Sequence, residues 1–106
     1  APEADVGPGD VPVTYEALSA LERTIRSRAI ERPEDSYTIK LLDDPQLIGE
    51  KIEEEAEEDV RAGREGTDAR VAEEAADLLY HLSVLLFSRG VSQADVMEVL
   101  NARSGQ

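Results

Sequence analysis

The sequence predicts an all-α protein, a bundle-like unit of four or five helices. Three observations support this prediction. Apolar residues recur three or four positions apart in four segments, which is the spacing of one helix face. No convincing run alternates between apolar and polar residues, as a half-buried strand would. Proline, glycine and capping residues separate the segments where helices are expected to begin and end.

Residues 1–14 are predicted to form a flexible leader or linker, because they hold three of the five prolines and few large apolar side chains. The helical domain is predicted to span 15–106. Its first helix is expected to begin at Tyr15, and its apolar face is Leu18, Leu21, Ile25 and Ala29. Pro33 disfavours helical backbone in the residue before it, so this helix is expected to end near residue 31.

The short apolar segment 37–42 is compatible with a helical turn or a loop. Asp44 followed by Pro45 is a strong helix start, with Asp as N-cap and Pro at the first helical position. This second helix is predicted to run to about residue 62, before a turn that contains Gly63 and Gly66. Its narrow apolar stripe consists of Leu47, Ile48, Ile52, Ala56 and Val60.

The third and longest helix is predicted from about residue 68 to residue 89, with Gly90 as its C-terminal cap. The side chains expected to face inward are Val71, Ala75, Leu78, Leu79, Leu82, Leu85 and Leu86. Ser92 and Asp95 form a capping-box pattern that opens a fourth helix, and residues 103–106 are expected to fray. The apolar residues of this fourth helix are Val96, Met97, Val99 and Leu100. Because the third helix is apolar on more than one face, we expect a homodimer formed by helix packing.

The composition excludes several classes of protein. Without cysteine, the chain has no disulfide, iron–sulfur cluster or thiolate zinc site, and its single histidine excludes a multi-histidine metal site. The formal net charge of −13 argues against nucleic acid and anionic membranes as partners. The most apolar window, 78–87, is too short to span a membrane. No secretory signal pattern is found near the N-terminus, so a cytoplasmic location is expected.

The excess of acids has two possible meanings. Acid-rich surfaces that are poor in lysine suit a high-salt cytoplasm, and this chain has only Lys40 and Lys51. Alternatively, the acids gather where a cation binds. They are concentrated in one stretch of the second predicted helix, which holds Glu50, Glu53, Glu54, Glu55, Glu57, Glu58 and Asp59. Seven acids cannot share one helix face, so Glu50, Glu53, Glu57 and Asp59 are expected on the solvated surface.

Two pairs of acids have matched spacing. Glu55 and Glu58 are three residues apart on the second predicted helix, and Glu74 and Asp77 are three apart on the third. Side chains at this spacing share a helix face, where like charges repel. If the two helices form an antiparallel hairpin, a hard divalent cation such as Mg²⁺ would relieve that repulsion. Solvated acidic helix faces remain the alternative interpretation.

The carboxylates also match a known motif. Glu54-Glu55-x-x-Glu58, a gap of residues 59–73, and Glu74-x-x-Asp77 resemble the motif of the all-α nucleoside triphosphate pyrophosphatase superfamily. Three flanking segments, 36–41, 76–82 and 89–96, resemble the phosphoribosyl-ATP pyrophosphatase family more narrowly. The resemblance covers roughly residues 15–104.

The resemblance implies a reaction: Mg²⁺-dependent hydrolysis of phosphoribosyl-ATP to phosphoribosyl-AMP and pyrophosphate, the second step of histidine biosynthesis. It also implies a cytoplasmic helical homodimer. In some organisms the family's domain is fused behind phosphoribosyl-AMP cyclohydrolase. The leader is then either a remnant of such a linker or an N-terminal extension. The chain departs from the family pattern at Glu53, Glu57, Asp59 and Arg61, which add charge without touching the motif carboxylates.

Roles for individual residues follow as hypotheses. Glu55, Glu58, Glu74 and Asp77 are the candidate metal ligands. Glu54 is the candidate base, or the residue that orients the attacking water.

Tyr37, Thr38, Lys40 and His81 are the candidate substrate contacts. Two alternatives stay open for them. Tyr37 can be a core residue with Lys40 in solvent, and His81 can be a satisfied histidine at a helix interface.

Two other functions compete with this interpretation. One is a house-cleaning pyrophosphatase of the same superfamily that acts on another nucleoside triphosphate. The segment 37–40 and the Tyr80-His81 pair favour the phosphoribosyl substrate over that alternative. The other is a non-catalytic acidic helical module, for which the paired carboxylates would be dispensable.

Overall fold

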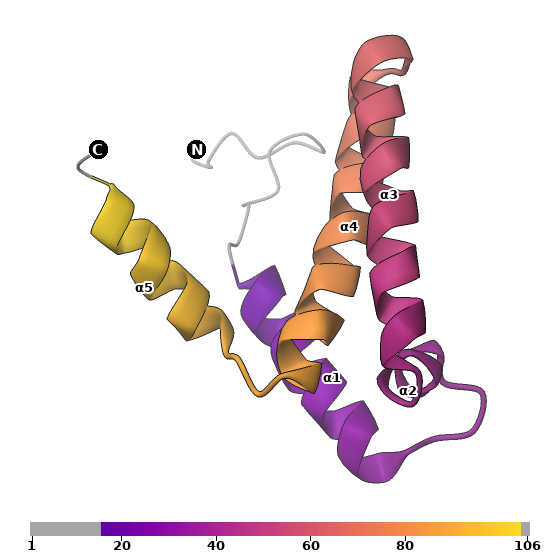
Figure 1. Ribbon diagram of the computed structural model, residues 1–106, viewed down its shortest axis with the longest axis vertical. Coiled ribbons are helices and arrows are strands. Elements are labelled where there is room, and N and C mark those ends of the chain that lie inside the picture. The colour runs from indigo at the N-terminus through magenta and orange to yellow at the C-terminus, as the bar shows by residue number, and fades with distance from the viewer. Residues whose placement is uncertain (1–15, 105–106) are drawn as a thin grey trace, which may run out of the picture.

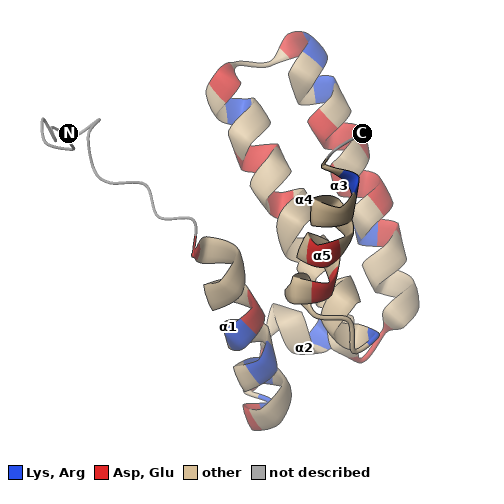
Figure 2. Cartoon of the chain, turned by 90° about the vertical axis from the view of Figure 1, so that its left-hand side faces the viewer, with Lys and Arg blue, Asp and Glu red and all other residues tan. Residues whose placement is uncertain are grey.

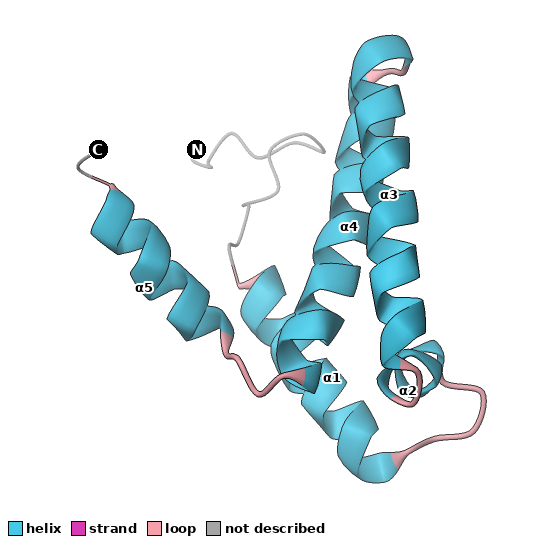
Figure 3. Cartoon of the chain, in the orientation of Figure 1, coloured by secondary structure: helices cyan, strands magenta, loops and turns pink. Residues whose placement is uncertain are grey.

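The computed structural model describes residues 16–104, which form five helices and no strand. The helices are α1 (Ala17–Glu31), α2 (Tyr37–Leu42), α3 (Pro45–Glu65), α4 (Asp68–Ser88) and α5 (Gln93–Arg103). Figure 3 shows that short loops join them. The prediction of an all-α fold is confirmed. The predicted leader, Tyr15 and residues 105–106 lie outside the described residues.

The hairpin of α3 and α4 forms the long axis of the domain. The two helices run side by side along their whole length from the turn that joins them (Figure 1). Helices α1 and α2 pack at the other end of this hairpin, and α5 extends from the end of α4 and contacts α1 (Figure 1). The hairpin therefore projects beyond the helices that anchor its base.

The core lies at that base and is small. Ile25 of α1, Leu41 of α2, Ile48 of α3 and Val84 of α4 are at most 1% exposed and pack as one cluster. Partly buried side chains surround them: Leu21, Leu42, Leu47, Ile52, Tyr80 and Phe87. Because each of the first four helices contributes one fully buried residue, this cluster fixes the base of the α3–α4 hairpin.

Side-chain caps explain where the helices begin. The Asp44 carboxylate accepts a hydrogen bond from the Leu47 amide at 3.2 Å, as predicted. Ser36 caps α2 by accepting from the Ile39 amide, which resolves segment 37–42 as a helix rather than a loop. Thr67 caps α4 in the same way. The capping box predicted for Ser92 and Asp95 is present at the start of α5.

Two predictions about α3 are wrong. The helix continues through Gly63 to Glu65, beyond the predicted end near residue 62, and Gly66 caps it. Packing against α4 outweighs the small propensity cost of one glycine. Val60, predicted in the apolar stripe, is exposed, and Ala62 is buried in its place.

The inward face predicted for α4 is partly wrong as well. Leu79 and Leu85 are exposed, whereas the residues that α4 buries are Glu74, His81, Ser83 and Val84. In α5, Met97, Val99 and Leu100 are also exposed. The apolar residues of α4 surround more than one face, and contacts with α1, α2 and α3 decide which face is covered. Figure 2 shows acidic positions on both arms of the hairpin as well as on α1 and α5.

The end of α4 has the backbone geometry that the sequence predicts. Gly90 has φ +71°, its amide donates to the Phe87 carbonyl, and the Val91 amide donates to the Leu86 carbonyl. These two hydrogen bonds define a Schellman motif, which requires a left-handed residue after the helix. This turn directs the chain from α4 into α5.

We predict that Gly90→Ala lowers the free energy of unfolding by roughly 1–2 kcal/mol, because a Cβ is strained in left-handed backbone. Urea denaturation followed by circular dichroism measures this change. Gly49→Ala is the matched control, since Gly49 lies within α3 with open space around it. Gly49→Ala should be neutral or stabilising by up to about 1 kcal/mol. Equal effects of the two variants would contradict the prediction.

Candidate metal centre

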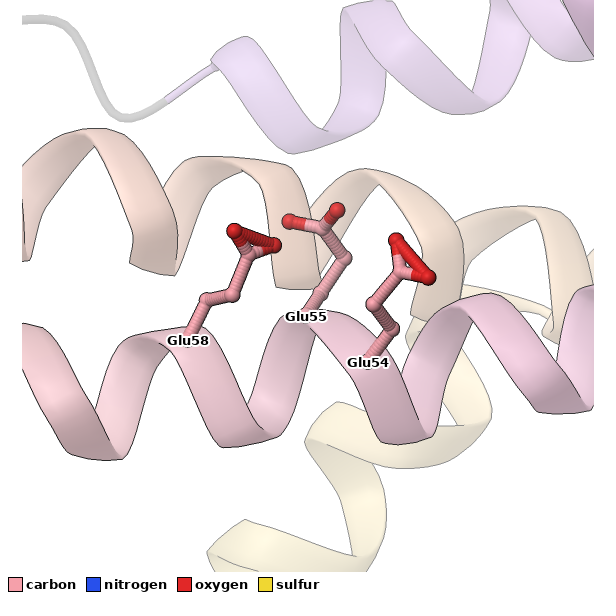
Figure 4. A group of neighbouring side chains, drawn as sticks. All are labelled: Glu54, Glu55 and Glu58. Carbon is pink, nitrogen blue, oxygen red and sulfur yellow. The ribbon is translucent and has the colours of Figure 1, made fainter.

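Carboxylates from α3 and α4 gather on the facing sides of the hairpin. Figure 4 shows Glu54, Glu55 and Glu58 projecting from one side of α3. One oxygen of each lies within 4.8 Å of the others. Glu55, Glu74 and Asp77 form a second such group across the two helices. The structure therefore brings together the four predicted metal ligands and Glu54, with Glu55 common to both groups.

Glu55 is in the least favourable position of the five. Its Oε2 atom is buried and has no hydrogen-bond partner among the described residues. Burial raises the pKa of this carboxyl above its usual value, and the charges of Glu58, Asp77 and Glu74 raise it further. His81 opposes this pKa shift. An orphaned carboxylate oxygen surrounded by other carboxylates is a site that a cation would stabilise.

The chemistry of the donors indicates which cation fits. Every candidate ligand is a carboxylate oxygen, and oxygen donors suit hard divalent cations such as Mg²⁺, Ca²⁺ or Mn²⁺. The residues present therefore fit a hard divalent cation.

Two basic residues that sequence reasoning missed neutralise part of this charge. The Arg70 guanidinium lies 2.9 Å from Oε2 of Glu74, whose side chain is 6% exposed whereas that of Arg70 is 58% exposed. The Lys51 ammonium donates to Oε1 of the exposed Glu54 at 3.2 Å, and this hydrogen bond raises the pKa of Lys51. Both pairs were visible in the sequence as opposite charges three or four residues apart on a helix.

The predicted substrate contacts Tyr37, Thr38 and His81 meet where α2 packs against α4. The Tyr37 hydroxyl lies 2.9 Å from Nε2 of His81, and Nδ1 of His81 lies 2.7 Å from the Asp77 carbonyl oxygen. A carbonyl only accepts, so Nδ1 carries a proton, and in the neutral ring Nε2 accepts from Tyr37. Thr38 hydrogen-bonds to the Tyr80 hydroxyl. Burial raises the pKa of Tyr37 further above neutrality, so its hydroxyl can donate.

These contacts bear on the alternatives left open for Tyr37, Lys40 and His81. Tyr37 is exposed on one side and stacks on Tyr80 on the other, so it is not a core residue. His81 is buried with a partner on each ring nitrogen, as a satisfied interface histidine would be. Lys40 is exposed and lines, with Tyr37, a surface hollow of about 550 Å³ beside the α1–α2 loop. Tyr37 therefore lines that hollow and also hydrogen-bonds to His81.

The remaining acids of α3 lie largely where the sequence predicts. Glu50, Glu53 and Glu57 are exposed. Asp59 is half-buried rather than fully solvated. Because Glu53 and Glu57 are exposed, these two departures from the family pattern do not cover the clustered carboxylates of α3 and α4.

The sequence matches a known family. The model of the phosphoribosyl-ATP pyrophosphohydrolase family matches residues 18–104, which include every helical residue from Leu18 to Arg103. The chain belongs to this family. This membership confirms the resemblance inferred from the carboxylate motif and its flanking segments.

Individual relatives are similar over most of the chain. A phosphoribosyl-ATP pyrophosphatase of Caulobacter vibrioides is 47% identical over 91 residues, which are 85% of this chain and 84% of that protein. One of Cereibacter sphaeroides is 46% identical over 89 residues, 83% of this chain and 86% of the relative. The histidine biosynthesis bifunctional protein HisIE of Xylella fastidiosa is 46% identical over 87 residues, 81% of this chain. The chain spans only 42% of that bifunctional relative.

Hydropathy adds one observation about the helices. Between residues 16 and 104, none of them is long and apolar enough to cross a membrane.

We predict that Glu55→Gln stabilises the metal-free protein at pH 7. Because the folded state raises the pKa of Glu55, the native chain binds this proton more tightly than the unfolded chain. Stability is therefore lost as pH rises from the ordinary value of 4.5 through the raised value, and the loss persists at neutral pH. Glutamine removes that loss, so Tm at pH 7 should rise by a few degrees, given that 1 kcal/mol corresponds to about 4–8 °C.

Thermal unfolding with EDTA at pH 4 and pH 7 measures this effect. The gain from Glu55→Gln should shrink at pH 4, where the wild-type carboxyl is protonated in the native chain. Glu53→Gln, an exposed acid on the same helix, is the matched control. A Glu55→Gln variant that is less stable than the wild type at pH 7 would show that Glu55 is not under strain.

Proposed function

We propose that this chain hydrolyses phosphoribosyl-ATP to phosphoribosyl-AMP and pyrophosphate with Mg²⁺ as its cofactor. The observation that carries the proposal is the group of Glu55, Glu74 and Asp77, in which one oxygen of Glu55 is buried without a partner. Family membership and the names of the relatives supply the substrate. In this role the protein performs the second step of histidine biosynthesis.

The proposed metal ligands are Glu55, Glu58, Glu74 and Asp77. When bound, Mg²⁺ would neutralise charge on the triphosphate and stabilise charge that develops on the leaving pyrophosphate. Water adds across the α–β phosphoanhydride: its oxygen joins one phosphorus, and the bridging oxygen leaves with the other. The proton that this water releases goes to a carboxylate or to solvent.

Glu54 is the proposed acceptor of that proton, or the group that orients the water. It is exposed, adjoins the ligand Glu55, and is held by Lys51 at 3.2 Å. Lys51 is a candidate phosphate contact from α3, because its ammonium lies beside Glu54 at the edge of the carboxylate cluster. Lys40 remains a proposed contact from α2.

His81 and Tyr37 are proposed to position the site. His81 donates to the backbone carbonyl of Asp77 and accepts from Tyr37, which joins α2 to the helix turn that carries a metal ligand. The half-exposed ring of Tyr37 is then available to the substrate on its other side.

The proposal also includes a link to a second enzyme and a cellular location. The bifunctional relative indicates a functional link to the cyclohydrolase that acts next, either as a fusion or as a separate enzyme. The cytoplasmic location expected from the sequence stays a prediction.

We also propose a homodimer. Exposed apolar residues include Leu79 and Leu85 on α4 and Met97, Val99 and Leu100 on α5. A domain with a core this small gains stability if a second copy covers such residues. Sedimentation equilibrium should show a dimer for the wild type and a smaller species for Leu79→Glu. A wild type that sediments as a monomer at high concentration would contradict this prediction.

Activity is tested by pyrophosphate release from phosphoribosyl-ATP, with Mg²⁺ and with chelator, at low and high salt. The wild type should release pyrophosphate only with metal. Glu55→Ala and Asp77→Ala should lose at least about 100-fold in turnover, as expected for loss of a metal ligand, while the helical circular dichroism is kept. Glu57→Ala is the matched control, because Glu57 is an exposed acid on the same helix as Glu55.

The other outcomes are equally informative. Full turnover by Glu55→Ala would refute the metal assignment. Release from another nucleoside triphosphate instead of phosphoribosyl-ATP would support the house-cleaning function. No release from any nucleotide and no specific effect of Mg²⁺ on thermal unfolding would support the non-catalytic module.

A further inference from the structure

A cavity of about 210 Å³ lies beside the clustered carboxylates of α3 and α4, on the side that faces the turn between the two helices. It is lined by Glu58, Arg61, Ala62, Glu65, Gly66, Arg70 and Glu74. Two of these residues, Glu58 and Glu74, are proposed metal ligands, so the cavity shares a wall with the proposed metal centre. Its volume equals that of about seven water molecules at ~30 Å³ each, which leaves room for an inorganic diphosphate.

Arg61 and Arg70 give this cavity a cationic lining from both helices. Arg70 pairs with the buried Glu74 at 2.9 Å, whereas Arg61 lies 3.5 Å from the exposed Glu57. In Figure 2 both arms of the hairpin carry blue Lys or Arg positions near the turn. Gly66 lets the turn close against Arg70, since a Cβ there would lie 2.9 Å from the Ala62 carbonyl oxygen and 3.4 Å from Cβ of Arg70.

The charge of the cavity depends on whether a metal is bound. Three carboxylates and two guanidiniums line it, which leaves one net negative charge. A divalent cation on Glu58 and Glu74 reverses that sign. The cation also competes with Arg70 for Glu74, because a carboxylate oxygen that ligates a metal is less available to a guanidinium.

We propose that this cavity binds the phosphate chain of the substrate, or inorganic diphosphate, once a divalent cation has displaced Arg70 from Glu74. Arg70 is the counter-ion of Glu74 without metal and an anion ligand with metal, and Arg61 is the second anion ligand. Guanidinium groups suit this role because their planar fork binds phosphate oxygens in pairs. The proposal rests on the proposed metal centre. It goes beyond the resemblance because Arg61 is a departure from the family pattern and Arg70 lies outside the motif.

Substitution of the two arginines should therefore have different effects on Mn²⁺ affinity and on diphosphate affinity. Arg70→Gln should bind Mn²⁺ several-fold more tightly than the wild type, since Glu74 no longer has a competing partner. With Mn²⁺ present, the same variant should bind diphosphate about tenfold more weakly, the effect of losing one charge-assisted hydrogen bond. Arg61→Gln should weaken diphosphate binding without tightening Mn²⁺, because its partner Glu57 is not a proposed ligand.

Two titrations on the intact protein test this proposal. Free Mn²⁺ is followed by electron paramagnetic resonance, and diphosphate is titrated by calorimetry at constant free Mn²⁺. Arg64→Gln is the matched control: it removes the same charge from the end of α3, and Arg64 does not line the cavity. Circular dichroism verifies that each variant is folded.

Each outcome either supports or overturns the proposal. The proposal is supported if Arg70→Gln tightens Mn²⁺ binding and weakens diphosphate binding, and if Arg64→Gln does neither. Arg70→Gln and Arg64→Gln variants with equal affinities would overturn it and leave the metal centre standing. Tighter Mn²⁺ binding with unchanged diphosphate affinity would overturn the anion site. A wild type that binds no Mn²⁺ would overturn the proposed function and this inference together.

Discussion

The packing of α3 against α4 forces carboxylates from two helices into one space. Glu55 precedes Glu74 by 19 residues and Asp77 by 22 in the sequence, yet one oxygen of each lies within 4.8 Å of the others. Such a group destabilises the hairpin, since burial and mutual repulsion both oppose ionisation of Glu55. The cluster of Ile25, Leu41, Ile48 and Val84 at the base offsets this cost. The apolar cluster thus lies at the base of the hairpin, and the mutually repelling carboxylates lie near the middle of its two helices.

Residues next to the clustered carboxylates respond to this mutual repulsion in different ways. Arg70, from an exposed position, and the partly exposed Lys51 supply positive charge to Glu74 and Glu54. His81 and Tyr37 contribute no formal charge in the neutral state; they fix the geometry of the helix turn that carries Asp77. Helix α2 is therefore part of the site, because it brings Tyr37 to a histidine forty-four residues away in the sequence.

The acidity of the chain now has two separable components. The exposed acids Glu50, Glu53 and Glu57 face solvent, where salt screens their repulsion. Around Glu55 the acids lie closer together, since one oxygen each of Glu55, Glu74 and Asp77 lies within 4.8 Å of the others. Oε2 of Glu55 is buried with no partner among residues 16–104, and a bound cation would relieve this repulsion. The exposed acids of α3 fit the first meaning of the acid excess, and the clustered carboxylates of α3 and α4 fit the proposed cation site.

The sequence by itself determined most of the local structure and the family. Caps such as Asp44, Ser92 with Asp95, and Gly90 were predictable because they act on backbone groups within a few residues. The motif carboxylates were predictable for the same reason, since their spacing places each pair on one helix face.

Only the tertiary structure decided which side chains are buried and which partners they meet. Val60, Leu79 and Leu85 were expected inside and lie outside, because an apolar residue on a broad helix face is covered only if another helix crosses there. The hydrogen bond from Tyr37 to His81 and the unpaired oxygen of Glu55 also depend on contacts between helices. The spacing along one helix cannot specify such contacts, because they are set by how the helices pack.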